Sequence, residues 1–378
     1  MHPIPFNRAA VTGREAEYVT RVIAEGPLHG DGPFSRACHE WLERITGSPR
    51  ALLTTSCTHA LELAALLLDL KSGDEVIVPP FTFVSTVNAI VLRGARPVFV
   101  DTRPDTLNLD ESRIEAAITP RTRAILLVHY AGIACEMDAI MSIATRYGLV
   151  VVEDNAHGLL GSYKGRPLGT FGTFATLSFH DTKNLSCGEG GALMINDTRY
   201  VDRAEIIREK GTNRTRFYRG QVDKYTWCDI GSSYLPSDIL AAYLLAQLES
   251  HSVIQERRHA LWARYAETLA AWAVNAGARL PVVPAGCQHP AHIFYLLMPS
   301  LEARTALLAH LRECRILAVF HYLPLHLSEM GRRLGGLEGQ FPVTEDISDR
   351  LVRLPLFFQL TDADQSRVID AVMECGRT

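Results

Sequence analysis

The sequence predicts an α/β protein with a mostly parallel central sheet flanked by helices, followed by a smaller C-terminal α/β unit. Between about residues 50 and 200, short β-rich runs alternate with helix-like segments. Several of these runs are apolar nearly throughout, which is typical of strands buried on both faces of a sheet. After residue 200 the alternation stops and a polar, basic segment begins.

Six runs in the first part have the composition of strands. They are EVIVPP (75–80), RPVFVD (96–101), RAILLVHY (123–130), LVVVED (149–154), ATLSFH (175–180) and GALMIN (191–196). Three segments have helical patterns, and they are THALELAALLLDL (58–70), DESRIEAAI (110–118) and MDAIMSIATRYG (137–148). Strands that alternate with helices favour a parallel sheet covered by helices.

The remaining chain has a different pattern. Residues 203–231 are polar, aromatic and basic, and most of them are predicted to form a loop. A helical stretch then runs from about Ser237 to Val274, before apolar runs at 293–299 and 316–324, a helix-like segment at 301–314 and a final helix near 362–374.

We therefore predict two domains, 1–245 and 246–378, because 378 residues exceed one ordinary core. Residues 1–25 are a segment that can pack on the smaller domain.

Composition excludes several classes of protein. The net charge of −4 does not favour nucleic acid as a partner, since phosphate backbones are bound by clustered Lys and Arg. The N-terminal residues have no apolar signal core, and no apolar run has the length of a membrane span. The eight cysteines contain no C-x-x-C pair, so we expect reduced thiols, no zinc cluster and a cytoplasmic location.

Open parallel sheets bind ligands at the carboxyl ends of their strands, so the residues after each run are candidates for a site. Ser56, Cys57 and Thr58 stand at the start of the first helix, where free N–H groups can bind a phosphate. The alternative is a simple Ser/Thr cap. Phe81 and Phe83 follow the second run, either as core residues or as a platform for a planar ligand.

Two charged residues follow later strands. Asp154 ends LVVVED and is followed by His157; a buried carboxylate there either caps a helix or meets a ligand cation. Lys183 follows ATLSFH and precedes a glycine-rich turn at 188–191. It is either a solvated loop charge or a nucleophile whose pKa is lowered in a dry pocket.

In combination, these residues match the needs of pyridoxal 5′-phosphate (PLP). The set contains a reactive lysine, a carboxylate for a pyridinium nitrogen, an aromatic ring for stacking, and hydroxyl and helix N–H groups for a phosphate. No single element is specific for PLP, but their order along the chain favours it.

The sequence resembles the DegT/DnrJ/EryC1/StrS family of PLP-dependent sugar aminotransferases along nearly its whole length. The motifs that carry the resemblance are IAEGPLHGDGPFSRACHEWLE, TSCTHALELAALLLDLKSGDEVIVPPFTFVSTVNAIVLRGA, VHYAGIACEMD, VVVEDNAHGLLGSYKGRPLGTFG, SFHDTKNLSCGEGG, HYLPLH and LPLFFQLT. The resemblance implies aspartate aminotransferase fold type I, L-glutamate as amino donor, a nucleotide-linked keto sugar as acceptor, and a homodimer with shared active sites.

Individual roles follow from matching positions. Lys183 matches the Schiff-base lysine, Asp154 the partner of the pyridine nitrogen, and Phe83 the stacking aromatic. His157 falls where the family has Gln or His near the ring oxygen. The phosphate cradle is matched by Ser56, Cys57, Thr58 and Ser178.

Two positions depart from the family pattern. Many relatives carry a G-[YF]-N-[YFH]-R segment whose asparagine reaches the PLP phosphate of the neighbouring subunit. Ser233 stands at that position here, and its shorter side chain can still donate one hydrogen bond. Cys57 stands where glycine is common, a change of small effect if the contact is made by a backbone N–H.

The sugar side of the site is predicted from the basic loop and from HYLPLH. The loop candidates are Arg214, Arg219, Lys224 and Tyr225, with a solvated surface loop as the alternative. His321, Tyr322 and His326 match sugar-side positions, and no carboxylate set completes a metal site with them.

Other outcomes remain open at this stage, including the opposite configuration at the aminated carbon and a 3-keto sugar. A sugar dehydratase or a non-enzymatic sensor on the same fold is disfavoured by Lys183, since dehydrating relatives carry histidine there.

Overall fold

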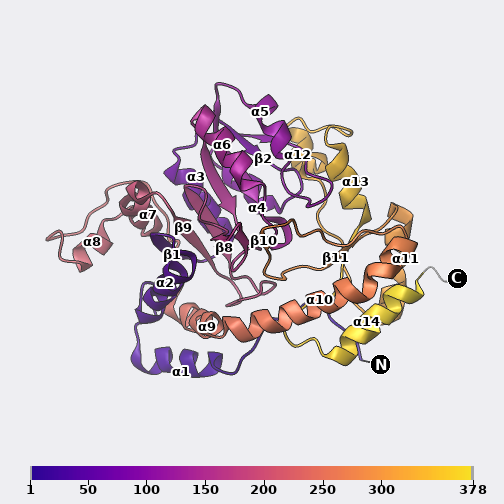
Figure 1. The fold of residues 1–378 in the computed structure, drawn as a ribbon. Helices are drawn as coiled ribbons and strands as arrows, with labels where there is room; N and C mark the ends of the chain where they lie inside the picture. The colour runs from indigo at the N-terminus through magenta and orange to yellow at the C-terminus, as the bar shows by residue number, and fades with distance from the viewer. Residues whose placement is uncertain (1, 376–378) are drawn as a thin grey trace.

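The computed structural model describes residues 2–375 and is built around a seven-stranded sheet (Figure 1). The strand order is β1-β9-β8-β5-β4-β2-β3. The strands are β1 (Arg50–Thr54), β2 (Glu75–Val78), β3 (Arg96–Phe99), β4 (Thr122–Val128), β5 (Val150–Asp154), β8 (Phe174–Ser178) and β9 (Gly191–Ile195). All neighbours from β8 to β3 pair in parallel, while β9 is antiparallel to both β8 and β1, which confirms a mostly parallel sheet.

All six predicted runs form strands of this sheet, but β1 was not predicted. It is as long as β8 and β9, but it lies at the edge of the sheet and pairs antiparallel with β9, outside the alternation of strands and helices on which the prediction was based.

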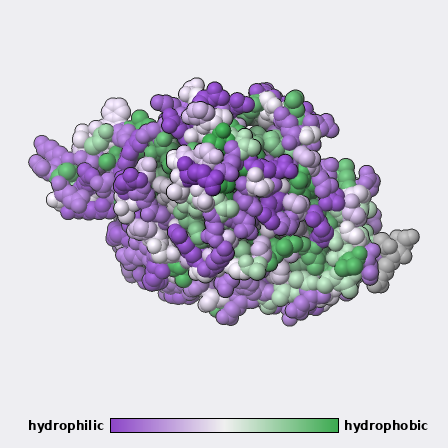
Figure 2. Space-filling model, turned by 45° about the horizontal axis from the view of Figure 1, so that its top comes forward, coloured by the Kyte–Doolittle hydropathy of each residue, from purple (hydrophilic) through white to green (hydrophobic). Residues whose placement is uncertain are grey.

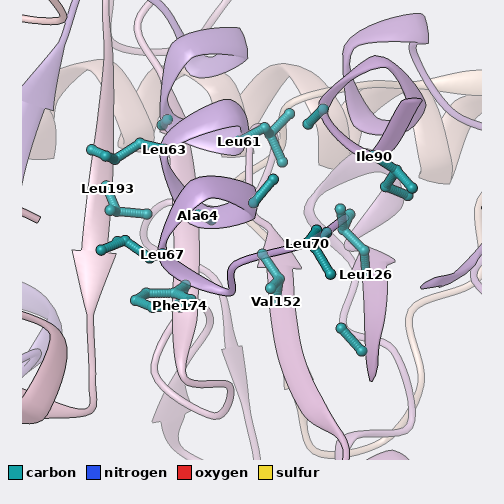
Figure 3. Close-up of a cluster of buried hydrophobic side chains, with 14 of the residues drawn as sticks. Leu61, Leu63, Ala64, Leu67, Leu70, Ile90, Leu126, Val152, Phe174 and Leu193 are labelled. Atoms are coloured by element: carbon teal, nitrogen blue, oxygen red, sulfur yellow. The ribbon is translucent and has the colours of Figure 1, made fainter. Parts of the chain in front are cut away.

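Helices cover both faces of the sheet. The helices in this part of the chain are α1 (Glu15–Glu25), α2 (Pro33–Thr46), α3 (Cys57–Leu67), α4 (Val84–Val91), α5 (Ile114–Ala117), α6 (Met137–Tyr147), α7 (Val201–Arg208), α8 (Arg214–Tyr218) and α9 (Asp238–Glu249), of which α8 projects away from the sheet (Figure 1). Strand β9 shows the two-sided burial directly: Leu193 joins the core under α3, and Met194 joins the core formed with α2 and α9. Figure 3 shows Leu63 and Leu67 of α3 beside Leu193 and Phe174.

Most of the segment 203–231 lies outside helices, as predicted, but its first residues belong to α7, where Ala204 and Ile207 are fully buried under α3. Two helix predictions need correction. The helix expected at 110–118 is a 3₁₀ turn followed by the short α5, since Pro120 restricts the preceding backbone. The long helix expected from Ser237 is divided at Ser250 into α9 and α10 (His251–Asn275).

The C-terminal part forms its own small core. Its elements are α10, β11 (Tyr295–Leu297), α11 (Leu301–Glu313), α12 (Glu329–Arg333), α13 (Pro342–Arg350), β12 (Leu351–Arg353) and α14 (Asp362–Glu374). The apolar run 316–324 forms only isolated bridges, one to Ile4 and one to Arg353. Ile4 is buried in this small core, whereas α1 packs on α9. The domain boundaries at 245/246 stay a prediction.

A further short sheet joins β6 (Ser162–Tyr163), β7 (Arg166–Pro167) and β10 (Cys287–Gln288). Within residues 2–375, no helix is both long and apolar enough to cross a membrane. None of the eight cysteines, all of which lie in this range, forms a disulfide.

Candidate active site

A cavity of about 720 Å³ lies at the carboxyl ends of the parallel strands, between the sheet and the small C-terminal unit. It brings together ten of the predicted site residues from segments far apart in the chain. They are Ser56, Cys57, Thr58, Phe83, Asp154, His157, Ser178, Lys183, His321 and Tyr322.

Lys183 lies in the turn between β8 and β9. The turn is held by backbone hydrogen bonds, among them Asp181 N–H to the Gly188 carbonyl (2.8 Å) and Lys183 N–H to the His180 carbonyl (2.9 Å). Removal from water lowers the pKa of Lys183 to about 8, while the nearby Cys57 and Asp154 act in the opposite direction. The lysine therefore becomes a neutral amine at a much lower pH than an ordinary lysine, as a nucleophile requires.

Asp154 is the last residue of β5 and is 5% exposed. The Thr86 hydroxyl donates to its Oδ2 (2.7 Å), and the Ala156 N–H donates to its Oδ1 (3.3 Å). Burial raises the pKa of Asp154. A cation bound opposite this carboxylate would favour its charged form, so the site suits a protonated ring nitrogen.

The N-terminus of α3 opens onto the same cavity. Ser56 caps the helix, since its Oγ accepts a hydrogen bond from the His59 N–H (3.1 Å). Gly191 of β9 runs so close that a Cβ there would lie 2.4 Å from the Cys57 nitrogen. Because Gly191 is paired with Ser178 on β8, the hydroxyl of Ser178 borders the same helix end. The simple cap therefore also forms part of a cradle for an anion.

Aromatic and imidazole rings form the remaining walls. Phe83 is 56% exposed at the cavity, whereas Phe81 is a core residue. The His157 ring lies 4.5 Å from the His292 ring, and burial holds the pKa of both histidines well below the usual value. Within residues 2–375, the buried Nδ1 of His157 has no hydrogen-bond partner, so it is available to a bound molecule.

Comparison with known proteins identifies the family. The model of the DegT/DnrJ/EryC1/StrS aminotransferase family matches residues 10–373. The chain belongs to this family.

Three relatives match this chain over nearly its whole length. The uncharacterized protein MJ1066 of Methanocaldococcus jannaschii is 36% identical over 348 residues, covering 90% of this chain and 89% of that protein. DesV of S. venezuelae, solved in complex with a ketimine intermediate, is 32% identical over 100% of both chains, with a TM-score of 0.90. Spr1654 of Streptococcus pneumoniae, solved in a PLP form, is 26% identical over 98% of both chains, with a TM-score of 0.90.

The fold is therefore PLP-dependent transferase fold type I, and the chain is a PLP-dependent aminotransferase. The residues of the cavity fit the cofactor. Lys183 offers the amine, Asp154 the buried carboxylate, and the α3 N-terminus with Ser178 the phosphate donors. The unpartnered His157 Nδ1 and the exposed ring of Phe83 offer further contacts.

The loop candidates lie elsewhere. Arg214, Arg219 and Ser233 line a second cavity of about 810 Å³. Arg219 pairs with Glu205 at 2.8 Å, and Arg214 donates to the Tyr218 hydroxyl at 2.7 Å. Lys224 and Tyr225 are exposed.

The HYLPLH residues are divided between two places. His321 and Tyr322 line the Lys183 cavity, and His321 Nδ1 lies 2.9 Å from the Tyr130 hydroxyl. His326 is fully buried outside the lining of that cavity, with its Nε2 2.9 Å from Glu345. Among residues 2–375, no group of three His, Cys, Asp or Glu side chains could hold a metal ion.

Sequence reasoning missed Thr86, His292 and Arg353 of this site. Thr86 lies in the first turn of α4, where nothing local marks it as the partner of Asp154. Arg353 had the clearest signal, because it is a charged residue between the buried Val352 and Leu354.

Proposed function

We propose that the protein transfers the amino group of L-glutamate to a nucleotide-linked keto sugar in the cytoplasm. The observation that carries the reaction type is Lys183, with its lowered pKa, in one cavity with the buried Asp154. The amino acceptor proposed is dTDP-4-dehydro-6-deoxy-D-glucose, and the product is dTDP-4-amino-4,6-dideoxy-D-galactose with 2-oxoglutarate.

Support for this sugar comes from residues 208–235. The segment REKGTNRTRFYRGQVDKYTWCDIGSSYL resembles the dTDP-4-amino-4,6-dideoxygalactose transaminase of enterobacterial common antigen synthesis. Spr1654, described above, carries the description of a sugar aminotransferase, which supports the broader substrate class.

Bound PLP supplies an electron sink that makes the carbon bearing the amino group acidic. The neutral amine of Lys183 then takes the proton from the α-carbon of glutamate and, in the second half of the cycle, delivers a proton to the sugar carbon. Asp154, which accepts a hydrogen bond from the Thr86 hydroxyl, would hold the ring nitrogen of bound PLP in its protonated form. The face from which Lys183 delivers its proton sets the configuration of the new amine.

The proposal includes a homodimer with shared active sites. Helix α8 and the following loop project from the molecule (Figure 1), and this projection is mainly hydrophilic in Figure 2. It nevertheless exposes large aromatic side chains, among them Tyr218 (66%) and Trp227 (78%). Such a basic, aromatic loop suits a nucleoside diphosphate bound at the active site of a neighbouring subunit. Ser233 is assigned to the same shared site.

The test is an NMR spectrum of the product formed from the PLP-loaded protein, L-glutamate and dTDP-4-dehydro-6-deoxyglucose. A small coupling between H3 and H4 means an axial amine and supports the galacto product. A large coupling means the gluco epimer and overturns the proposed configuration. Turnover only with a 3-keto sugar would overturn the proposed substrate while leaving the family unchanged.

A further inference from the structure

Arg353 is a charged side chain at the wall of the active-site cavity. It ends β12, and its neighbours Val352 and Leu354 are 0% and 1% exposed. Its guanidinium lies over the ring of Phe6, 4.6 Å from the centroid. Within residues 2–375, its side chain has no ion pair and no hydrogen bond, and its Nε is buried.

Two buried arginines, Arg208 and Arg258, have acceptors within the protein. Arg208 donates to both carboxylate oxygens of Asp31, at 3.0 and 2.7 Å, and to the Leu53 carbonyl. Arg258 donates to the carbonyls of Ala291 and His292. Arg353 is half-buried, and its buried Nε–H has lost water without gaining an acceptor from the described residues, which is costly. The exception at Arg353 therefore points to an acceptor that arrives from solution.

The reaction brings three kinds of anion to this cavity: the cofactor phosphate, the diphosphate of the nucleotide and the carboxylates of the amino donor. The cofactor phosphate has its donors at the N-terminus of α3, which packs on the large sheet. The second has the basic loop from Arg214 onward. Arg353 belongs to neither set, since it stands on the small C-terminal unit with His321.

We propose that Arg353 binds a carboxylate group of the amino donor and orients the donor toward Lys183. Its planar guanidinium suits bidentate binding of a carboxylate, and the stacked ring of Phe6 restricts its orientation. The inference takes the donor from the proposed function. Because the keto sugar has no carboxylate, Arg353 serves the first half of the cycle and not the second.

The experiment separates the two half-reactions in four proteins: the native chain, Arg353→Met, Arg353→Lys and Arg333→Gln. Arg333 is 68% exposed and pairs with Glu329, so its loss controls for one missing charge. PLP-loaded protein is mixed with L-glutamate alone, and the cofactor absorbance is followed. Arg353→Met is expected to weaken the apparent affinity for glutamate by about 10- to 100-fold. The affinity of Arg353→Lys is expected to lie between those of the native chain and Arg353→Met.

The second half-reaction starts from protein loaded with pyridoxamine phosphate and mixed with the keto sugar. Here Arg353→Met is expected to change the rate by less than about threefold, since no carboxylate is bound. Calorimetry with glutarate, a dicarboxylate that cannot react, gives a readout without turnover: the native chain and Arg333→Gln bind it, and Arg353→Met does not.

Four results would overturn the inference. The first two are an unchanged glutamate affinity in Arg353→Met and a failure of the native chain to bind glutarate. An equal loss in the sugar half-reaction would assign Arg353 to the diphosphate, and a loss of PLP affinity would assign it to the cofactor phosphate. A native chain that reacts with glutamate but not with the sugar would refute the proposed acceptor and leave the role of Arg353 tested.

Discussion

The ionisable side chains of the Lys183 cavity and those of the α8 loop lie in opposite environments. In the cavity, Lys183 and Asp154 are shielded from water. Burial lowers the pKa of Lys183 and raises the pKa of Asp154, which favours the neutral form of each side chain. In the loop, the arginines lie near the surface and pair with acids: Arg216 with Asp202 and Arg219 with Glu205. The cavity therefore suits proton transfer by Lys183, whereas the loop suits the nucleotide binding that we propose for it.

The two regions also differ in the number of subunits that our proposal requires for them. The groups that fit PLP come from one chain, because strands of a single sheet end at one edge. Arg214 and Arg219 line a separate cavity and the loop exposes aromatic rings, and our proposal is that this loop completes the sugar site of a second subunit. The following experiments test this separation, starting with the largest effect.

Lys183→Ala is expected to reduce turnover by at least about 10⁴-fold, because the nucleophile and proton carrier is lost. Circular dichroism and thermal unfolding should show a retained fold. Lys164→Ala removes a lysine that is 60% exposed and paired with Asp138, and it serves as the matched control. Substantial turnover in Lys183→Ala would refute the assigned mechanism.

Asp154→Asn keeps the size of the side chain and removes its charge. We expect turnover to fall by roughly 10²- to 10³-fold, because the ring nitrogen loses its anionic partner. Single-turnover kinetics with glutamate measure the effect, and Asp138→Asn, on a side chain that is 65% exposed, provides the control. Equal losses in both variants would argue against a specific role of Asp154.

Mixing two inactive variants tests whether the site is shared. Lys183→Ala and the double variant Arg214→Ala/Arg219→Ala are each expected to be impaired. If the loop acts on the neighbouring subunit, mixed dimers contain one site with both native parts, and activity returns. The gain is measured after subunit exchange, against each variant exchanged with itself. No gain, in dimers verified by sedimentation, would place the loop on its own chain's site.

The pH dependence of PLP capture tests the environment of Lys183. Its pKa is lowered to about 8, so the amine is protonated below that pH and neutral above it. The capture rate of the apo protein should therefore rise about tenfold per pH unit and level off above pH 8. Stopped-flow absorbance provides the measurement. A rise that continues toward the ordinary lysine pKa would mean that the lysine is not desolvated.

Cys57→Gly is expected to have the smallest effect. If the phosphate is bound by the backbone N–H at this position, the PLP dissociation constant should stay within about threefold of the native value. Thr58→Ala removes a hydroxyl and is expected to weaken PLP by about 3- to 10-fold. Titration of both apo variants compares them, and a larger loss in Cys57→Gly would assign a role to the thiol.

Much of the cofactor site could be predicted because its residues follow strands with strong signals. LVVVED and ATLSFH are buried on both faces, so the rule of carboxyl strand ends places Asp154 and Lys183 together. The prediction failed where the signal was remote. Strand β1 lies outside the alternation of strands and helices and pairs antiparallel with β9, and α7 is defined by burial under α3 rather than by a strong pattern of its own.

The sequence by itself determined the local features of this protein: the apolar strands, the Ser56 cap, and the glycine-bearing turn after Lys183. These depend on periodicity and hydrogen bonds within a few residues. Only the tertiary structure decided the lowered pKa of Lys183, the position of Arg353 across the cavity, and the separation of Ser233 into a second cavity. Desolvation and cavity walls arise from packing between distant segments, and no local pattern records them.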